Sequence, residues 1–298
     1  MGSIHQLILR DGIEEARRQA VTKHERSVVE AAYQVLSADA EKIGFTYSGF
    51  ALTSLPHKPV SSGVWRREGH NLTLVLETSH DATGVPFGLP YGSYARFILL
   101  FLQSRAVKSQ SREIELGRSM RQWMETMGLS IGGTTYRLVN EQARRISGCR
   151  MTFHHTAAGR SVMRHGGFVD GAVSMTDSGA QSHLWQDRVL LNQQFYDALL
   201  AHPVPVSEAA LRAIGPRSMA IDVYIWLAYR LHALTDDATL GWPALLAQFG
   251  AGYREIRNFR PHFLECLQIA LAAYPGARVS ADTSGVVLQP SRPAIAAA

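Results

Sequence analysis

The chain has 298 residues, of which 46% are hydrophobic and 18% are charged, and its formal net charge is +5 at pH 7. This composition is ordinary for a folded protein, and the length predicts two domains. The longest wholly apolar run in the first half is Phe97 to Leu102, far below the roughly 20 residues that span a bilayer. The N-terminus carries no signal-peptide core. We therefore expect a cytoplasmic protein with no membrane partner.

Residues 1–23 are predicted to form an N-terminal arm, and apolar residues at helical spacing predict a helix from His24 to Ile43. Leu72, Leu74 and Leu76 then alternate along the chain as in a half-buried strand. The next segment, GVPFGLPYGSYARFILLFLQSRAV, reads as a loop followed by a helix that is apolar nearly all round. Such a helix belongs in the centre of a domain.

Two short helices separated by a glycine-bearing turn follow, which is typical of a helix-turn-helix. The predicted elements are a strand at Arg112–Leu116, a helix at Arg118–Met127, a turn at Gly128–Gly133 and a helix ending near Ser147. On the second helix, one side is predicted to pack and consists of Tyr136, Val139, Ala143 and Ile146. The opposite side carries Arg137, Glu141, Arg144 and Arg145. Strands at Arg150–His155 and Gly159–Asp177 would form a wing.

The same order of elements recurs in the second half of the chain. The predicted elements are a strand at Val189–Leu191, helices at Gln193–His202, Glu208–Ile214, Met219–Leu234 and Trp242–Phe249, a turn at Gly250–Gly252, a helix ending near Ala273, and a hairpin of Arg278–Asp282 with Val286–Leu288. On the last helix Ile256, Phe259, Phe263, Leu267 and Leu271 would be buried. Arg254, Arg257 and Asn258 project away from that stripe, with Arg260 at its margin.

The simplest fold that fits this order is α+β and mainly helical, with two tandem winged-helix domains, each a helix-turn-helix plus a β-hairpin. The predicted boundaries are an arm at 1–23, domain 1 at 24–186, domain 2 at 187–290 and a disordered tail at 291–298.

Positive charge is concentrated in the first of these domains. Between Gly88 and Arg164 twelve basic residues face four glutamates, a balance of +8 that exceeds the charge of the whole chain. Of the 30 basic residues 26 are arginine, whose planar fork binds phosphates and guanine edges bidentately. A concentrated positive surface gains free energy by releasing the counterions of nucleic acid. The pattern predicts a DNA-binding protein.

We predict that nine residues contact DNA: Arg137, Arg144 and Arg145 on the first recognition helix, Arg160 and Arg164 on the wing, and Arg254, Arg257, Asn258 and Arg260 on the second recognition helix. The alternative for the helical arginines is a solvated helix face. For Arg160 and Arg164 it is a mobile exposed loop.

Other chemistries lack support in the sequence. The adjacent His154 and His155 would point to opposite faces of a strand, so they cannot easily share a metal ion. The sequence contains no G-x-x-x-x-G-K-[ST] for a nucleotide triphosphate. Cys149 and Cys266 are predicted to be reduced core thiols. We therefore expect no catalytic residue, no metal and no cofactor.

Four sequence blocks follow one another along the chain: GLPYGSYARFILLFL, SREIELGRSMRQWMETMGLSIGG, PVPVSEAALRAIGPRSMAIDVYIWLAYRL and LGWPALLAQFGAGYREIRNFRPHFLECL. They resemble the plasmid-encoded RepA family of replication initiators and follow that family's order, over roughly Leu72 to Leu288. The resemblance implies tandem winged helices that bind repeated origin sites, called iterons, in double-stranded DNA. It also implies recruitment of the host initiator and replicative helicase, and homodimers that repress their own promoter. Pro261, inside the second recognition helix, departs from the family pattern.

Three alternatives stay open on the sequence. The first is a winged-helix transcriptional repressor without a role in initiation. The second is an origin-nicking nuclease, which the sequence disfavours because it lacks a carboxylate or histidine cluster with metal-ligand spacing. The third is an interaction scaffold whose winged helices bind protein.

Overall fold

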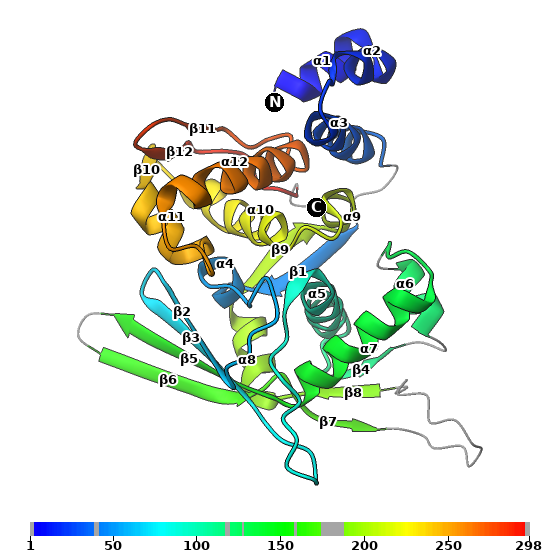
Figure 1. The fold of residues 1–298 in the computed structure, drawn as a ribbon, viewed down its shortest axis with the longest axis vertical. Coiled ribbons are helices and arrows are strands. Elements are labelled where there is room, and N and C mark those ends of the chain that lie inside the picture. Colours follow the sequence, from blue (N-terminus) through cyan, green and yellow to red (C-terminus); the bar gives the residue numbers. More distant parts are fainter. Residues whose placement is uncertain are drawn as a thin grey trace. The chain divides into compact units, whose positions relative to one another are not determined.

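The computed structural model describes residues 3–38, 42–116, 120–126, 128–157, 160–173 and 188–295 (Figure 1). The chain is α+β, with more residues in helices than in strands, which confirms the predicted class. Contacts divide it into two compact units. Unit 1 comprises Met1–Gly44, Phe50–Ser54 and Val204–Ala298, and unit 2 comprises Phe45–Gly49 and Leu55–Pro203. The short elements β1 (Ile43–Tyr47), α4 (Gly49–Leu52) and β9 (Pro203–Ser207) lie at or across this division. It differs from the domain boundaries predicted at residues 23 and 186.

Unit 1 begins with three helices, α1 (Ser3–Asp11), α2 (Ile13–Gln19) and α3 (Lys23–Leu36). A capping box starts α3: the Thr22 hydroxyl accepts from the Glu25 amide, and the Glu25 carboxylate accepts from the Thr22 amide. The predicted end of this helix at Ile43 is wrong, because the Ser37 amide already closes the last turn on the Tyr33 carbonyl.

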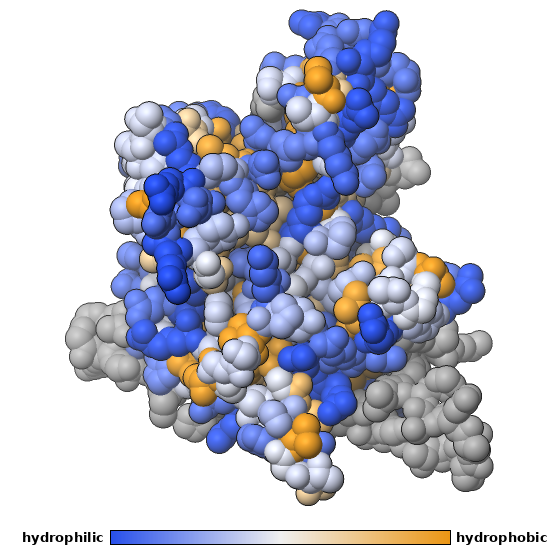
Figure 2. All heavy atoms as spheres, viewed as in Figure 1, coloured by the Kyte–Doolittle hydropathy of each residue, from blue (hydrophilic) through white to orange (hydrophobic). Residues whose placement is uncertain are grey.

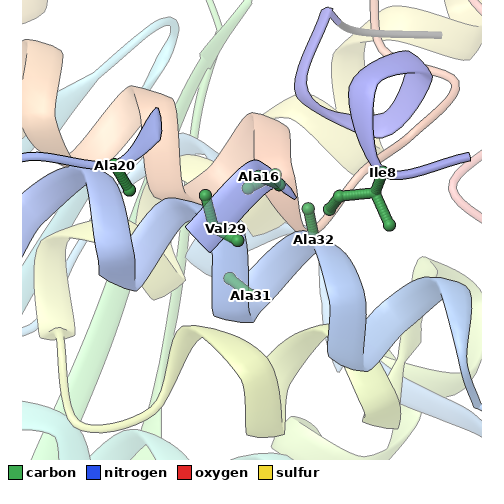
Figure 3. Packing of buried hydrophobic residues seen from close by; sticks show 7 residues of the cluster. Ile8, Ala16, Ala20, Val29, Ala31 and Ala32 are labelled. Carbon is green, nitrogen blue, oxygen red and sulfur yellow. The ribbon is translucent and has the colours of Figure 1, made fainter. Parts of the chain in front are cut away.

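Small side chains hold the three N-terminal helices together (Figure 3). The cluster consists of Ile8, Ala16, Ala20, Val29, Ala31 and Ala32, and it includes Ala272 near the end of the chain. Alanine brings helices close, so a small apolar area suffices to dock them. The segment predicted to be an N-terminal arm is therefore helical over most of its length and packed on unit 1.

The rest of unit 1 surrounds one buried helix, α10 (Ser218–Arg230), in which Trp226 and Tyr224 have at most 1% of their surface exposed. Around it lie α9 (Glu208–Ile214), the short helix η1 (Leu231–Ala233), α11 (Trp242–Phe249) and α12 (Ile256–Ala272). The strands β10 (Ala238–Gly241), β11 (Val279–Ala281) and β12 (Gly285–Leu288) form an antiparallel sheet in the order β10-β12-β11. The predicted closing hairpin is thus present.

Residues 291–295, predicted to belong to a disordered tail, are packed on unit 1. The Ser291 amide donates to the Leu231 carbonyl, and the Tyr274 hydroxyl donates to the Arg292 carbonyl at 2.6 Å. Ile295 is 5% exposed. The prediction failed because these bonds join residues remote in sequence; residues 296–298 lie outside the described part.

Unit 2 surrounds α5 (Gly92–Ser109), which is buried along most of its length as predicted. It also contains α6 (Met120–Thr126), α7 (Gly133–Ser147) and α8 (Gln193–Ala201). One antiparallel sheet has the order β2-β3-β5-β6, with strands at Val64–Gly69, Leu72–Thr78, Cys149–Ala157 and Arg160–Gly167. A second sheet has the order β4-β8-β7, with strands at Glu113–Glu115, Arg188–Leu191 and Val169–Val173.

The predicted wing of unit 2 is part of a larger sheet. Strand β5 pairs with β6 on one side and with β3 on the other, where Leu74 lies opposite Phe153. Leu72, Leu74 and Leu76 are buried on one face of β3, and this apolar face holds the hairpin against the unit. The long return strand predicted at Gly159–Asp177 is two strands over residues 160–173, β6 and β7, with the buried Phe168 between them. Residues 159 and 174–177 lie outside the described part.

Candidate nucleic-acid interface

In unit 1 a tight turn joins α11 to α12. Gly252 has φ +89°, a left-handed conformation that favours glycine. The predicted buried stripe of α12 is confirmed at Phe259, Phe263 and Leu267, all at most 3% exposed. These buried side chains fix the rotation of α12 about its own axis, which leaves Arg257 and Asn258 exposed in its first turn.

Arg257 and Asn258 are exposed in the first turn of α12, whereas Arg254, predicted on this helix, is exposed in the turn just before it because the helix begins at Ile256. The Arg257 side chain is 80% exposed and forms an ion pair with Glu255, the N-cap residue. Among the described residues, no side chain caps the first turn of α12. Its first amides and Arg254, beside the Arg257–Glu255 pair, therefore form a surface suited to anions.

Pro261 lies inside α12 and is exposed. Proline has no amide hydrogen to donate to the carbonyl four residues earlier, that of Arg257. The helix nevertheless starts at Ile256, five residues before it. Pro261, which departs from the family pattern, thus lies on the outer side of α12 and does not end the helix.

Arg260 behaves differently from its neighbours. Its Nη2 donates to the Asp282 carbonyl at 3.0 Å, and its guanidinium lies 4.9 Å from the centre of the Trp242 ring. The side chain therefore lies against the hairpin of β11 and β12, and it is not aligned with Arg257.

In unit 2, α6 and α7 are joined by a turn that ends at Gly132, the N-cap of α7. Gly132 offers no capping side chain, and Gly133 and Thr134 are exposed beside it. Sequence reasoning missed this uncapped helix start and the Thr134 hydroxyl, although the pair of glycines was its signal. Arg137 is exposed one turn further along.

Arg144 is exposed as predicted, and its guanidinium lies 5.2 Å from the centre of the Phe87 ring. The Arg144 charge also contributes to the lowered pKa of Asp81, whose main causes are hydrogen bonds from Thr83 and Val85. Arg144 is thus exposed to solvent and also contacts Phe87 in a neighbouring loop.

Arg145 is bound to its own unit. It forms an ion pair with Glu141 at 2.9 Å and donates to the Leu89 carbonyl at 3.2 Å, and its guanidinium lies 5.2 Å from the centre of the Tyr91 ring. Only 21% of the side chain is exposed. This geometry joins α7 to the loop before α5.

The packed side of α7 agrees with the predicted one at Val139 and Ile146 and differs at the other two positions, Tyr136 and Ala143. Thr135, Val139, Gln142 and Ile146 are buried, whereas Ala143 is exposed. Gln142 can be buried because its Oε1 accepts from the Tyr91 amide at 2.8 Å. Burial of a polar side chain is tolerated when it is hydrogen-bonded, a condition that residue type alone does not reveal.

Arg160 and Arg164 lie on β6, where their backbones pair with Ala157 and Phe153. Their side chains are outside the described part of the structure, so their predicted role stays a prediction.

Other arginines of the basic segment bind protein groups. Arg96 is 4% exposed and donates to the carbonyls of Leu55 and Pro56. Arg112 pairs with Asp170 at 2.8 Å.

The two cysteines are free and buried, as predicted. Burial raises the pKa of each thiol to about 12.

His154 and His155 are adjacent on β5. Among the residues whose positions are given, no three His, Cys, Asp or Glu side chains are grouped as for a metal ion. In the same part of the chain, no helix is long and apolar enough to cross a membrane.

A sequence profile described as "Plasmid encoded RepA protein" matches residues 89–242, which is just over half of the chain. The chain belongs to this family. The RepA family match spans α5, α6, α7 and the start of α11, and thus includes the exposed arginines of α7. It ends before α12. No curated protein matches the RepA family chain.

Solved structures show the fold of the chain. A crystal structure of domains 2 and 3 of RctB, with selenomethionine, is similar over 82% of this chain and 98% of its own, with 9% identity and a TM-score of 0.52. Another structure of RctB domains 2 and 3 covers 80% of this chain and 94% of its own, with 11% identity and a TM-score of 0.47. At these identities the first match shows a common fold alone.

Proposed function

We propose that this chain is a plasmid replication initiator that binds repeated sequences of its origin in double-stranded DNA. The observation that carries the proposal is the outer side of α12. Arg257 and Asn258 are exposed there, with Arg254 just before the helix, and Phe259 and Phe263 bury the opposite side. Arginine reads guanine and asparagine reads adenine in the major groove, each through two hydrogen bonds.

We further propose that each unit contains a winged helix. In unit 1 the order α10, β10, α11, α12, β11 and β12 supports this, as does the sheet in which β10 joins the hairpin. In unit 2 the corresponding order is α5, β4, α6 and α7, followed by β5 to β8. The second helix of each helix-turn-helix, α12 or α7, would enter a major groove.

Two linked DNA-binding units would bind much more tightly than either alone, because binding of one raises the effective concentration of the other. This supports recognition of repeated sites. By the family resemblance, dimers would also repress the initiator's own promoter, and monomers would recruit the host initiator and the replicative helicase. Catalysis is not part of the proposal.

DNase I footprinting of the DNA that flanks the gene tests the proposal. We expect protection of a repeated sequence at salt concentrations that abolish binding to random DNA. A repressor would protect the promoter alone, whereas an initiator would also make an AT-rich segment reactive to permanganate in the presence of host factors. Nicks in supercoiled origin DNA with a divalent metal would instead favour the nuclease alternative.

A protein-binding scaffold is the remaining alternative. Figure 2 shows polar residues over much of one face, with apolar residues in separate small groups among the described residues. Large contiguous apolar patches are typical of protein interfaces, so this face offers little support for a scaffold.

A further inference from the structure

Arg260 lies where three elements of unit 1 meet. It extends from α12, its guanidinium covers the Trp242 ring at the start of α11, and its Nη2 reaches the Asp282 carbonyl in the turn between β11 and β12. Trp242 is 4% exposed and lies edge-on to Phe263 of α12, with ring centres 6.1 Å apart. The contacts therefore join the predicted reading helix to the hairpin.

The Asp282 carbonyl accepts two hydrogen bonds. One comes from Arg260 at 3.0 Å and the other from the Trp242 Nε1 at 3.2 Å. The Trp242 amide also donates to the Ser284 carbonyl at 3.4 Å. Both side chains thus bind the same point of the hairpin.

The turn is closed by hydrogen bonds within itself. The Asp282 carboxylate accepts from the Ser284 amide, the Ser284 hydroxyl and the Gly285 amide, at 2.6 to 3.0 Å. These bonds lower the pKa of Asp282. The pairing of β12 with β10 anchors the body of the hairpin, and the bonds of Arg260 and Trp242 hold its turn against α11 and α12.

Exposure separates Arg260 from the neighbouring arginines. Arg254 and Arg257 are exposed, whereas Arg260 is half-buried and one face of its guanidinium is covered by an indole ring. A cation over an aromatic face is attracted to the ring as well as to the carbonyl, so releasing it to bind DNA would forfeit both contacts.

We propose that Arg260 is a positioning residue that fixes the β11–β12 hairpin relative to α12 and does not itself contact DNA. The inference rests on the proposed function, because it assumes that α12 and the hairpin bind one duplex together. The hairpin carries exposed Arg278 and Thr283, which are suited to phosphate contacts. A hairpin fixed in advance avoids an ordering cost on binding.

The first test needs no DNA. Amide hydrogen exchange is measured in the free full-length protein for wild type, Arg260→Ala and Arg257→Ala. We expect faster exchange of the Ser284 and Gly285 amides in Arg260→Ala, and unchanged exchange in Arg257→Ala, a variant of an exposed arginine on the same helix. Unchanged exchange of these amides in Arg260→Ala would overturn the proposal.

The second test is a double-mutant cycle on DNA affinity with Arg260→Ala and Trp242→Phe, which removes the Nε1 donor and keeps an aromatic ring. We expect roughly tenfold weaker binding for Arg260→Ala, and a double variant little weaker than the worse single variant. Additive losses would identify Arg260 as a direct DNA contact. If wild type shows no salt-dependent DNA binding, the proposed function fails, while the exchange experiment still decides the role of Arg260 in the hairpin.

Discussion

Arg145 and Glu141 form an ion pair at 2.9 Å across one turn of α7, and the same guanidinium donates to the Leu89 carbonyl before α5. The sequence places both residues on the outward side of a recognition helix. In the structure the two side chains pair with each other, and Arg145 also binds the Leu89 carbonyl. This favours a role of Arg145 in holding α7 in place.

The variant Arg145→Ala should therefore destabilise the protein. Loss of the ion pair, the carbonyl bond and the contact with Tyr91 should lower the free energy of unfolding by about 1 to 2 kcal/mol. Urea unfolding measures this. Arg137→Ala is the control, because Arg137 is exposed on the same helix and its loss should change stability by less than about 0.5 kcal/mol. Equal stabilities of the two variants would contradict the assignment.

Arg257→Ala should weaken binding to origin DNA and reduce discrimination at one base pair by about 1 to 3 kcal/mol, with the fold intact. Competition binding against single-base variants of the protected sequence measures this. Arg10→Ala, at an exposed arginine paired with Asp11 on α1, is the control. A parallel loss on random and origin DNA would show that Arg257 contacts phosphate only.

Gly285→Ala should disrupt the hairpin sheet of unit 1. A Cβ at this position would overlap the Leu240 carbonyl oxygen, which is backbone and cannot move aside cheaply. We expect a loss of more than about 2 kcal/mol in thermal or urea unfolding. Gly241→Ala, at the paired position on β10, is the control, since the nearest atoms to its Cβ are 3.6 Å away or more. A tolerated Gly285→Ala would refute the packing of β10 on β12.

His5 should make the docking of the N-terminal helices sensitive to acid. It is 1% exposed, its Nε2 lies 2.8 Å from the Ala272 carbonyl, and its Nδ1 has no partner among the described residues. Burial lowers its pKa. The unfolded state then binds more protons, so stability is complete above the unfolded pKa of about 6.5 and falls as pH decreases below it.

The comparison of wild type with His5→Gln checks this dependence. Glutamine keeps a donor for the Ala272 carbonyl and does not titrate. The difference in unfolding free energy between the two proteins should change between pH 7 and pH 5, in the direction that penalises wild type at low pH. A difference independent of pH would show that His5 does not stay neutral in the folded state.

Cys149 and Cys266 should be unreactive in the native protein. The pKa of each buried thiol is raised to about 12, so almost no thiolate is present at pH 8. Ellman's reagent should label neither residue until denaturant is added, and the labelling rate should then follow unfolding. Rapid labelling of a single thiol in the native state would contradict its burial.

Helices could be predicted from the sequence where a local pattern of apolar residues and glycines determines them. The helix Trp242–Phe249 was predicted at its observed bounds, because an apolar run is followed directly by a glycine turn. The stripe of Phe259, Phe263 and Leu267 also follows from helical period alone.

The roles of individual arginines were not readable, because they depend on contacts between remote residues. Arg260 and the Asp282 carbonyl are 22 residues apart, and Arg145 and the Leu89 carbonyl are 56 apart. Arg96 contributes to the positive charge of the basic segment, yet its side chain is buried and donates to the carbonyls of Leu55 and Pro56. Sequence gives the charge of a segment, whereas tertiary contacts decide how much of that charge reaches solvent.

Binding of the full-length protein to the DNA flanking its gene, measured against salt concentration and compared with random DNA, tests the central claim most directly. For six to ten phosphate contacts, raising salt from 50 to 200 mM should weaken binding by about 10³ to 10⁵. We expect this steep dependence on both DNAs, together with a preference for a repeated flanking sequence that Arg257→Ala reduces. Binding that is absent, insensitive to salt or equal on the two DNAs would contradict a sequence-specific initiator.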